Sequence, residues 1–271
     1  MNTAPGVWRD LARHKDLVIG LTRRELFSPF AGSRFGILWS LLHPVLQMLV
    51  YMVVFSYIFE IRMGADASGG LDDYPAFVLS GLVPWLAWSA LLNTACSTVI
   101  NSASLVKQAD FPAEVLPLRT LLVCLVPHLV SLMLLGLYVL IGHGTLPGSL
   151  TLLVLALVFQ VLAMLGLSYI LSAVCVFVRD IKEVVFVLTG LGMFLTPALY
   201  PPDMMASRPV LSALINLNPI SHFVNIYRDA LYWGELRHTL SWWLAAAFAA
   251  LALFVGRRGF LRLRLFFGNF L

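Results

Sequence analysis

The longest uncharged stretch of the sequence decides the fold class. It lies between Arg119 and Arg179 and holds 59 residues, TLLVCLVPHLVSLMLLGLYVLIGHGTLPGSLTLLVLALVFQVLAMLGLSYILSAVCVFV, at positions 120–178. A helix needs about 20 apolar residues to cross the hydrocarbon core of a bilayer. The turn-forming residues at 142–149, GHGTLPGS, divide the stretch near its middle. The stretch therefore predicts two membrane-spanning helices joined by a short loop.

The composition of the whole chain agrees with a membrane protein. Of its 271 residues, 60% are hydrophobic and only 12% are charged, and the mean hydropathy is +0.88. Soluble domains carry about 25% charged residues, which cover the surface that faces water. The composition therefore excludes an ordinary cytosolic enzyme, a disordered chain and a nucleic-acid-binding protein, so no nucleic acid partner is expected.

Charged residues also delimit the other spans, because a charge at the centre of a span costs about 2.5–3.5 kcal/mol. The uncharged intervals predict an all-α polytopic membrane protein with six transmembrane helices. These lie at about 35–59, 76–100, 118–141, 150–178, 184–200 and 239–256. Residues 203–237 are too polar to face lipid, and they predict a pair of short re-entrant or interfacial helices around Asn218-Pro219.

The segments that flank the spans are basic. Residues 1–34 carry six Lys and Arg residues and lack the apolar core of a signal peptide. They predict an amphipathic helix on the membrane surface, or else a tether that only sets orientation. The tail 257–271 is expected to be a basic surface helix or a strand-like extension. The tryptophans near the span ends, Trp85, Trp88, Trp242 and Trp243, are expected to be interfacial anchors.

The distribution of Lys and Arg predicts the orientation. The side that holds both termini and the segments 101–119 and 179–182 receives 14 of the 18 Lys and Arg residues. Because cytoplasmic segments are enriched in these residues, both termini are expected in the cytoplasm.

The sequence lacks the groups that ion-coupled transport, metal binding or ATP binding would require. Apart from Arg119 at the edge of the third span, the predicted spans contain no Asp, Glu, Lys or Arg, which ion-coupled transporters usually carry. The three cysteines show no metal-ligand spacing, so no metal site is expected. The chain also has no G-x-x-x-x-G-K-[ST] phosphate-binding loop. The chain is therefore expected to be a non-catalytic subunit without a cofactor, and any uphill transport would take its energy from another polypeptide.

The segment 107–119, KQADFPAEVLPLR, combines helix signals with prolines. Asp110 is suited to cap a helix, Pro112 suits its first turn, and Pro117 lies near its end. The segment predicts a short rigid helix displayed for docking, with an ordinary loop as the alternative.

Six short motifs carry a resemblance to a known family. In chain order they are Gly36-x-Leu38-Trp39-x4-Pro44, Tyr74-Pro75-x4-Ser80-Gly81-Leu82-x-Pro84-Trp85, Phe111-Pro112-x-Glu114-x-Leu116-Pro117, Phe177-x-Arg179-Asp180-Ile181, Thr196-Pro197-x-x-Tyr200-Pro201, and Asn218-Pro219-Ile220 with Tyr227-Arg228. Across residues 8–260 the sequence resembles the ABC-2-type polysaccharide export permeases.

The resemblance implies a homodimeric permease of the bacterial inner membrane that exports lipid-linked polysaccharide of the O-antigen, teichoic acid or capsule type. A separate nucleotide-binding ATPase subunit would bind ATP and Mg and dock under short cytoplasmic helices. The docking residues would be Lys107, Asp110, Phe111, Pro112 and Glu114, with Arg23, Arg24 and Glu25 of the amphipathic helix. The outer gate would include Asn218, Pro219, Tyr227 and Arg228.

Aromatic residues repeat along two predicted spans. Tyr51, Phe55 and Phe59 share one face of the first span, and Phe186 and Phe194 share one face of the fifth. Aromatic rings pack well on the C–H faces of sugars, so these residues predict the lining of a substrate channel. Ordinary helix packing or contact with membrane lipids is the alternative.

Two other functions remain open at this stage. One is an ABC-2 exporter of a small molecule or lipid, which would share the fold. The other is a non-catalytic membrane scaffold of glycan synthesis, which would not require an ATPase partner.

Overall fold

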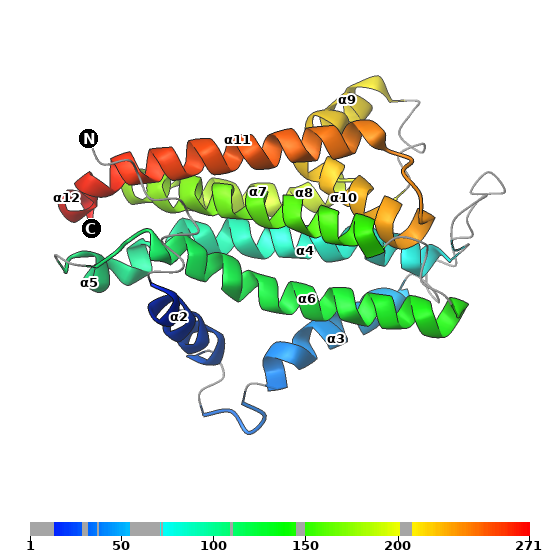
Figure 1. The fold of residues 1–271 in the computed structure, drawn as a ribbon, viewed down its shortest axis with the longest axis horizontal. Coiled ribbons are helices and arrows are strands. Elements are labelled where there is room, and N and C mark those ends of the chain that lie inside the picture. Colours follow the sequence, from blue (N-terminus) through cyan, green and yellow to red (C-terminus); the bar gives the residue numbers. More distant parts are fainter. Residues whose placement is uncertain are drawn as a thin grey trace.

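The computed structural model describes residues 14–28, 32–36, 38–54, 71, 73–108, 111–144, 150–200 and 208–271. Every regular element in these ranges is helical (Figure 1). The longer helices are α2 (Lys15–Phe27), α3 (Leu38–Val53), α4 (Tyr74–Thr98), α6 (Val115–His143), α7 (Leu150–Phe177), α8 (Ile181–Leu195), α9 (Pro209–Leu217), α10 (Pro219–Arg228) and α11 (Thr239–Leu263). The shorter elements are η3 (Ile100–Ser102), α5 (Ala103–Val106), the π-helical η5 (Asp229–Trp233), η6 (Arg264–Phe266) and α12 (Phe267–Phe270).

In the described part of the chain, four helices are long and apolar enough to cross a membrane, namely Tyr74–Thr98, Val115–His143, Thr151–Phe177 and Thr239–Phe270. Helices α4, α6 and α7 alternate in direction and lie along the long axis of the molecule, with α11 beside α7 (Figure 1). Helices α3 and α8 are shorter, with 16 and 15 residues; α3 falls within the predicted first span, and α8 overlaps the predicted fifth span but begins at Ile181, before its predicted start at 184. The chain is therefore a multi-pass membrane protein, and its described residues form helices without strands.

Helix α4 is the centre of the bundle. It packs against α6, α7, α8 and α10, and 72% of its most apolar window is buried. The corresponding fraction is 33% for both α6 and α11, whose outer faces expose apolar side chains such as Met133 and Leu251. Lipid tails would solvate these outer faces, since they are as apolar as the side chains.

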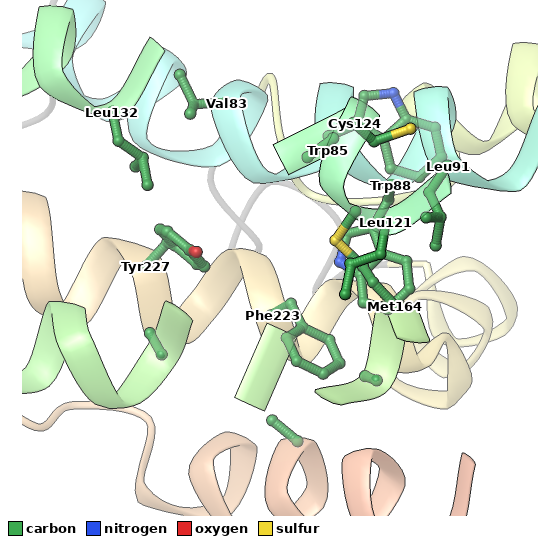
Figure 2. Packing of buried hydrophobic residues seen from close by; sticks show 14 of the residues in the cluster. Val83, Trp85, Trp88, Leu91, Leu121, Cys124, Leu132, Met164, Phe223 and Tyr227 are labelled. Atoms are coloured by element: carbon green, nitrogen blue, oxygen red, sulfur yellow. The ribbon is translucent and has the colours of Figure 1, made fainter. Parts of the chain in front are cut away.

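Aromatic packing fastens α10 to the central helix. Trp88 of α4 is fully buried and meets Phe223 of α10 edge to face, with 5.1 Å between the ring centroids. Figure 2 shows these two rings together, with Leu121 of α6 and Met164 of α7 close by. Trp88 thus joins α4 to α10 within a buried cluster that also includes Leu121 of α6 and Met164 of α7.

The predicted role of the tryptophans as interfacial anchors is wrong for three of the four. Trp85, Trp88 and Trp242 are at most 7% exposed, and only Trp243 is exposed. The buried rings fill contacts between helices. Trp85, for example, packs where Gly192 of α8 leaves room for it.

Helices α7 and α11 approach each other through glycines. A Cβ atom on Gly166 would lie 2.3 Å from the carbonyl carbon of Ala252, and one on Gly256 would lie 2.2 Å from the carbonyl oxygen of Gly166. Neither position accepts a side chain unless a helix backbone moves. The two glycines therefore set the distance between α7 and α11.

The C-terminal tail continues as helix, so the strand-like alternative is wrong. Helix α11 extends to Leu263 and is followed directly by η6 and α12. Phe260 and Phe267 of this segment are fully buried, and their rings meet Tyr169 and Phe177 of α7. Helical spacing brings these apolar side chains to α7.

Substitution Gly256→Ala should destabilise the protein by about 1–3 kcal/mol, because the new methyl group meets the backbone of α7. The matched control is Gly259→Ala on the same helix, where a Cβ atom meets nothing within 4 Å. That control should gain up to about 1 kcal/mol of helix propensity. Thermal unfolding of the detergent-purified variants measures the difference, and equal melting temperatures would contradict the close contact.

Candidate functional site

Polar and charged side chains gather at the two ends of the bundle. We call the end that holds α5, the start of α6 and α12 the α12 end, and the end that holds α9, η5 and the start of α11 the α9 end (Figure 1). Those predicted docking residues that the structure describes fall at the α12 end, and the predicted gate residues lie toward the α9 end.

At the α12 end, helix α2 is held against α6 by an ion pair. Arg119 Nε of α6 lies 2.6 Å from Glu25 Oε2 of α2, and Arg119 Nη1 donates to Ser102 Oγ at 3.3 Å. Val18 and Thr22 of α2 are buried. The amphipathic helix is thus fixed to the bundle by both packing and charge.

A pocket of about 350 Å³ opens between α2, the η3–α5 segment and α6. Its lining is mostly polar and consists of Leu21, Arg24, Glu25, Ser28, Asn101, Ser102, Ser104, Leu105 and Arg119. The predicted docking residue Arg24 is exposed at this pocket, whereas Glu25 turns inward toward Arg119.

The segment 107–119 differs from the predicted helix. Residues 111–114, which we call the turn 111–114, form no helix and contain a turn at Ala113 and Glu114; α6 begins at Val115, so Pro117 lies in the first turn of α6. Proline is tolerated there because the first N–H groups of a helix have no partner within it. The prediction of a short docking helix that ends near Pro117 is therefore wrong, and a short helix, α5, lies just before this segment instead.

The structure separates the predicted docking residues into two groups. Arg23, Arg24 and Lys107 are exposed, and Phe111 and Pro112 are half-buried in the turn. Glu25 and Glu114 are both engaged in ion pairs within the chain. Asp110 lies outside the described residues.

Toward the α9 end, α9 and α10 meet at Asn218. The Asn218 side-chain oxygen accepts from the backbone N–H of Ile220 at 3.1 Å and so caps α10, and Pro219 is the first residue of α10. The Asn218 amide nitrogen donates to Thr196 Oγ1 at 3.0 Å, which joins this corner to the end of α8. Asn218 thus fixes three helices at one point.

His222 links the same corner to α11. Its Nε2 atom lies 3.0 Å from the carbonyl oxygen of Asn216, and its Nδ1 atom lies 3.1 Å from Ser241 Oγ. Burial lowers the pKa of His222, and its hydrogen bond to Asn216 opposes that shift. The charged imidazolium is therefore disfavoured here.

Arg228 ends α10 inside the protein, where it is 1% exposed. Its guanidinium carbon lies 3.8 Å from the centre of the Phe77 ring, and Nη2 donates to the carbonyl oxygen of Ala198 at 3.0 Å. Among the described residues, Nε and Nη1 have no hydrogen-bond partner. Gly81 leaves the space that the guanidinium occupies, since a Cβ atom there would lie 3.0 Å from Nη2. This side chain therefore joins α4, α10 and the end of α8.

The neighbouring Tyr227 packs toward α6. Its side chain is fully buried, and its hydroxyl lies 3.2 Å from His128 Nε2. All four predicted gate residues thus lie in one connected region between α8, α10, α4 and α6.

Asp229 is a buried polar residue that the sequence did not single out. Its carboxylate accepts hydrogen bonds from the His238 backbone N–H at 3.0 Å, from His238 Nδ1 at 2.7 Å and from Trp242 Nε1 at 2.9 Å. The side chain is 0% exposed. It connects η5 to the first turn of α11. The only sequence signal was a single acid next to Arg228, within the segment 203–237 for which the sequence predicts short re-entrant or interfacial helices.

The predicted channel residues lie on two separate helices. Tyr51 is half-buried on α3, which packs on α6 and α4. Phe186 and Phe194 are 65% and 64% exposed on α8, which packs on α4, α7 and α9. Phe55 and Phe59 lie outside the described residues. Among the described residues, no three His, Cys, Asp or Glu side chains gather as a metal site would require.

Substitution Asp229→Asn should destabilise the protein by about 2–3 kcal/mol, because an amide replaces a buried carboxylate that accepts three hydrogen bonds. The matched control is Glu235→Gln, an exposed acid whose partner is Arg237, and it should change stability by less than about 1 kcal/mol. Melting temperatures of the purified variants test this. Similar losses for both variants would show that the Asp229 network contributes no more than a surface ion pair.

Comparison with known proteins gives a consistent picture. Residues 17–232, from α2 to η5, match the family described as ABC-2 type transporter. The chain is 31% identical over 225 residues to the O-antigen export system permease protein RfbA of Myxococcus xanthus, covering 83% of each chain. It is 25% identical over 231 residues to the protein of the same name from Klebsiella pneumoniae, covering 82% of this chain and 83% of the relative.

A further relative, the polysialic acid transport protein KpsM of Escherichia coli, is 24% identical over 243 residues, covering 89% of this chain and 91% of the relative. The family match spans most of the chain and includes the turn 111–114, the α9–α10 corner and Arg228. The chain therefore belongs to the ABC-2 type transporter family.

Proposed function

We propose that this chain is the transmembrane subunit of an ATP-driven ABC exporter that moves lipid-linked polysaccharide across the bacterial inner membrane. The observation that carries the proposal is its similarity, over more than four fifths of its length, to permeases named for O-antigen and polysialic acid export. The chain itself makes no chemical bond in this scheme. A separate nucleotide-binding subunit binds ATP and Mg, since the sequence has no phosphate-binding loop.

In this proposal α3, α4, α6, α7, α8 and α11 are the six spans. Helices α3 and α8 are short for a bilayer, but a short apolar helix is accommodated by local thinning of the membrane. The α12 end faces the cytoplasm, which is supported by its Lys107, Arg179, Lys182 and the tail arginines. Two copies of the chain form the channel between them.

The α12 end is the proposed docking surface for the ATPase. Support comes from the exposed Arg23, Arg24 and Lys107, and from the half-buried Phe111 in the turn beside α5. Because α2 is tied to α6 through Glu25 and Arg119, a push on this surface would reach a membrane span directly. The proposed outer gate is the α9–α10 corner together with the buried Arg228 at the end of α10.

The glycan path is proposed along the exposed aromatic face of α8. Phe186 and Phe194 project from a helix whose buried face packs on α4, so they are available to a substrate or to a second copy of the chain. In the first span, Tyr51 on α3 is the aromatic residue proposed to line the same path.

The first experiment is deletion of the gene, followed by localisation of the lipid-linked polysaccharide of the host. Accumulation on the inner face of the cytoplasmic membrane, with none at the surface, is the expected result. An unchanged surface glycan would instead favour an ABC-2 exporter of a small molecule or lipid. Loss of the glycan everywhere would favour a scaffold of glycan synthesis.

Substitution Lys107→Glu should weaken association with the ATPase subunit several-fold, because it reverses a charge at the proposed docking surface. The matched control is Arg208→Glu, an equally exposed charge reversal at the α9 end. Co-purification of the ATPase with each variant measures association. Equal recovery of the ATPase with both variants would place the docking surface elsewhere.

The double variant Phe186→Ala/Phe194→Ala should lower surface glycan several-fold while ATPase association is retained. The matched control is Leu188→Ala/Leu195→Ala, which removes apolar side chains from the opposite side of the same helix. Quantification of surface glycan separates the two. Equal export in both double variants would leave α8 with a packing or lipid-facing role only.

A further inference from the structure

The C-terminal residues 260–271, which we call the tail segment, contact the turn 111–114. Arg264 of the tail segment forms an ion pair with the carboxylate of Glu114. The hydroxyl of Tyr169 on α7 donates to the backbone carbonyl oxygen of the same glutamate at 3.3 Å. Glu114 is therefore held through both its side chain and its backbone.

The tail segment is itself anchored on both sides of Arg264. Before it, the Phe260 ring meets Tyr169 with 5.3 Å between centroids. After it, Phe177 of α7 meets Phe267 at 6.0 Å and Phe270 at 4.8 Å. Phe260 and Phe267 also contact each other at 5.4 Å. Aromatic pairs of this kind contribute about 0.5–1.5 kcal/mol each beyond their burial.

The ion pair differs from an ordinary surface contact in its burial. The Glu114 side chain is 14% exposed and that of Arg264 is 37% exposed. Removal of the arginine would leave a largely desolvated carboxylate without its cation, which costs more than the loss of an exposed pair. Arg262, two residues earlier, is exposed instead. The tail segment thus presents one of its arginines to the turn and another to solvent.

We propose that the tail segment is a positioning clamp, in which Arg264 fixes the turn 111–114 in the orientation that it presents at the α12 end. The clamp stands on contacts within this chain. Its consequence for export rests on the proposed function, in which the turn receives the motion of the ATPase. Arg264 and the aromatic residues around it are positioning residues, and they act on the partner only through the turn.

The clamp is tested by labelling a cysteine placed in the turn. Ala113 is 7% exposed, so Ala113→Cys should react slowly with a hydrophilic maleimide in the detergent-purified full chain. The parent chain gives the background, because its three cysteines are buried. Arg264→Glu and Glu114→Arg should each accelerate labelling about five-fold or more, as the turn opens.

The charge-swapped pair Arg264→Glu/Glu114→Arg should restore slow labelling, because the ion pair re-forms with its ends exchanged. The swap and the single variant Glu114→Arg both carry an arginine at position 114, next to the thiol. A difference in their labelling rates therefore reflects the ion pair and not the local charge. The matched control Arg262→Glu should label at the rate of the parent Ala113→Cys chain. Unchanged labelling in the two single variants, or no recovery in the swap, would overturn the clamp.

Surface glycan is measured for the same variants in cells. Several-fold loss of export in the single variants, with recovery in the swap, is the result expected if the turn couples to the ATPase. If labelling responds as expected but export stays normal, the clamp is upheld and docking at the turn is refuted. If labelling does not respond, the clamp is refuted whatever the level of export.

Discussion

A chain inside hydrocarbon must satisfy its polar groups without water, and this constraint arranges the whole structure. Backbone groups are paired within helices, and hydroxyls follow the same rule: Ser131 and Ser172 donate to carbonyl oxygens four residues earlier. In the middle of the bundle, polar side chains pair between helices, as Asn93 of α4 does with Thr189 of α8 at 3.0 Å. The ion pairs that join two described residues all lie at the ends of the bundle. The ends therefore hold the side chains that set the positions of helices relative to one another.

The same constraint explains how much of the fold the sequence predicts. Because a charge is costly in lipid, uncharged intervals locate α4, α6, α7 and α11 well. Hydropathy carries no information about which neighbour a residue meets, so the burial of Trp88 and the turn at 111–114 could not be predicted. Helix α4 is the clearest example: its hydropathy predicts a membrane span, but it does not predict that other helices surround this span instead of lipid.

The sequence predicts those parts of the site whose interactions join residues close together in the chain. The Asn218-Pro219 corner is a capping signal within three residues, and it forms as expected for a helix start. The pairs Glu25–Arg119 and Glu114–Arg264 join residues far apart in the chain, and no spacing rule connects them. These pairs change how the docking residues are understood, because two acids expected to face a partner are occupied within the chain.

The π-helical element η5 has an electrostatic consequence. A π-helical turn is wider than an α-helical one, so it shifts the rotational phase of the residues that follow. Arg228 and Asp229 are adjacent in sequence, yet the arginine lies on Phe77 of α4 and the aspartate binds Trp242 of α11. Two buried charges of opposite sign thus point to different helices at the junction between α10 and η5. This junction carries a fixed dipole, so any rotation of the helix there would have to carry both charges away from their partners at once.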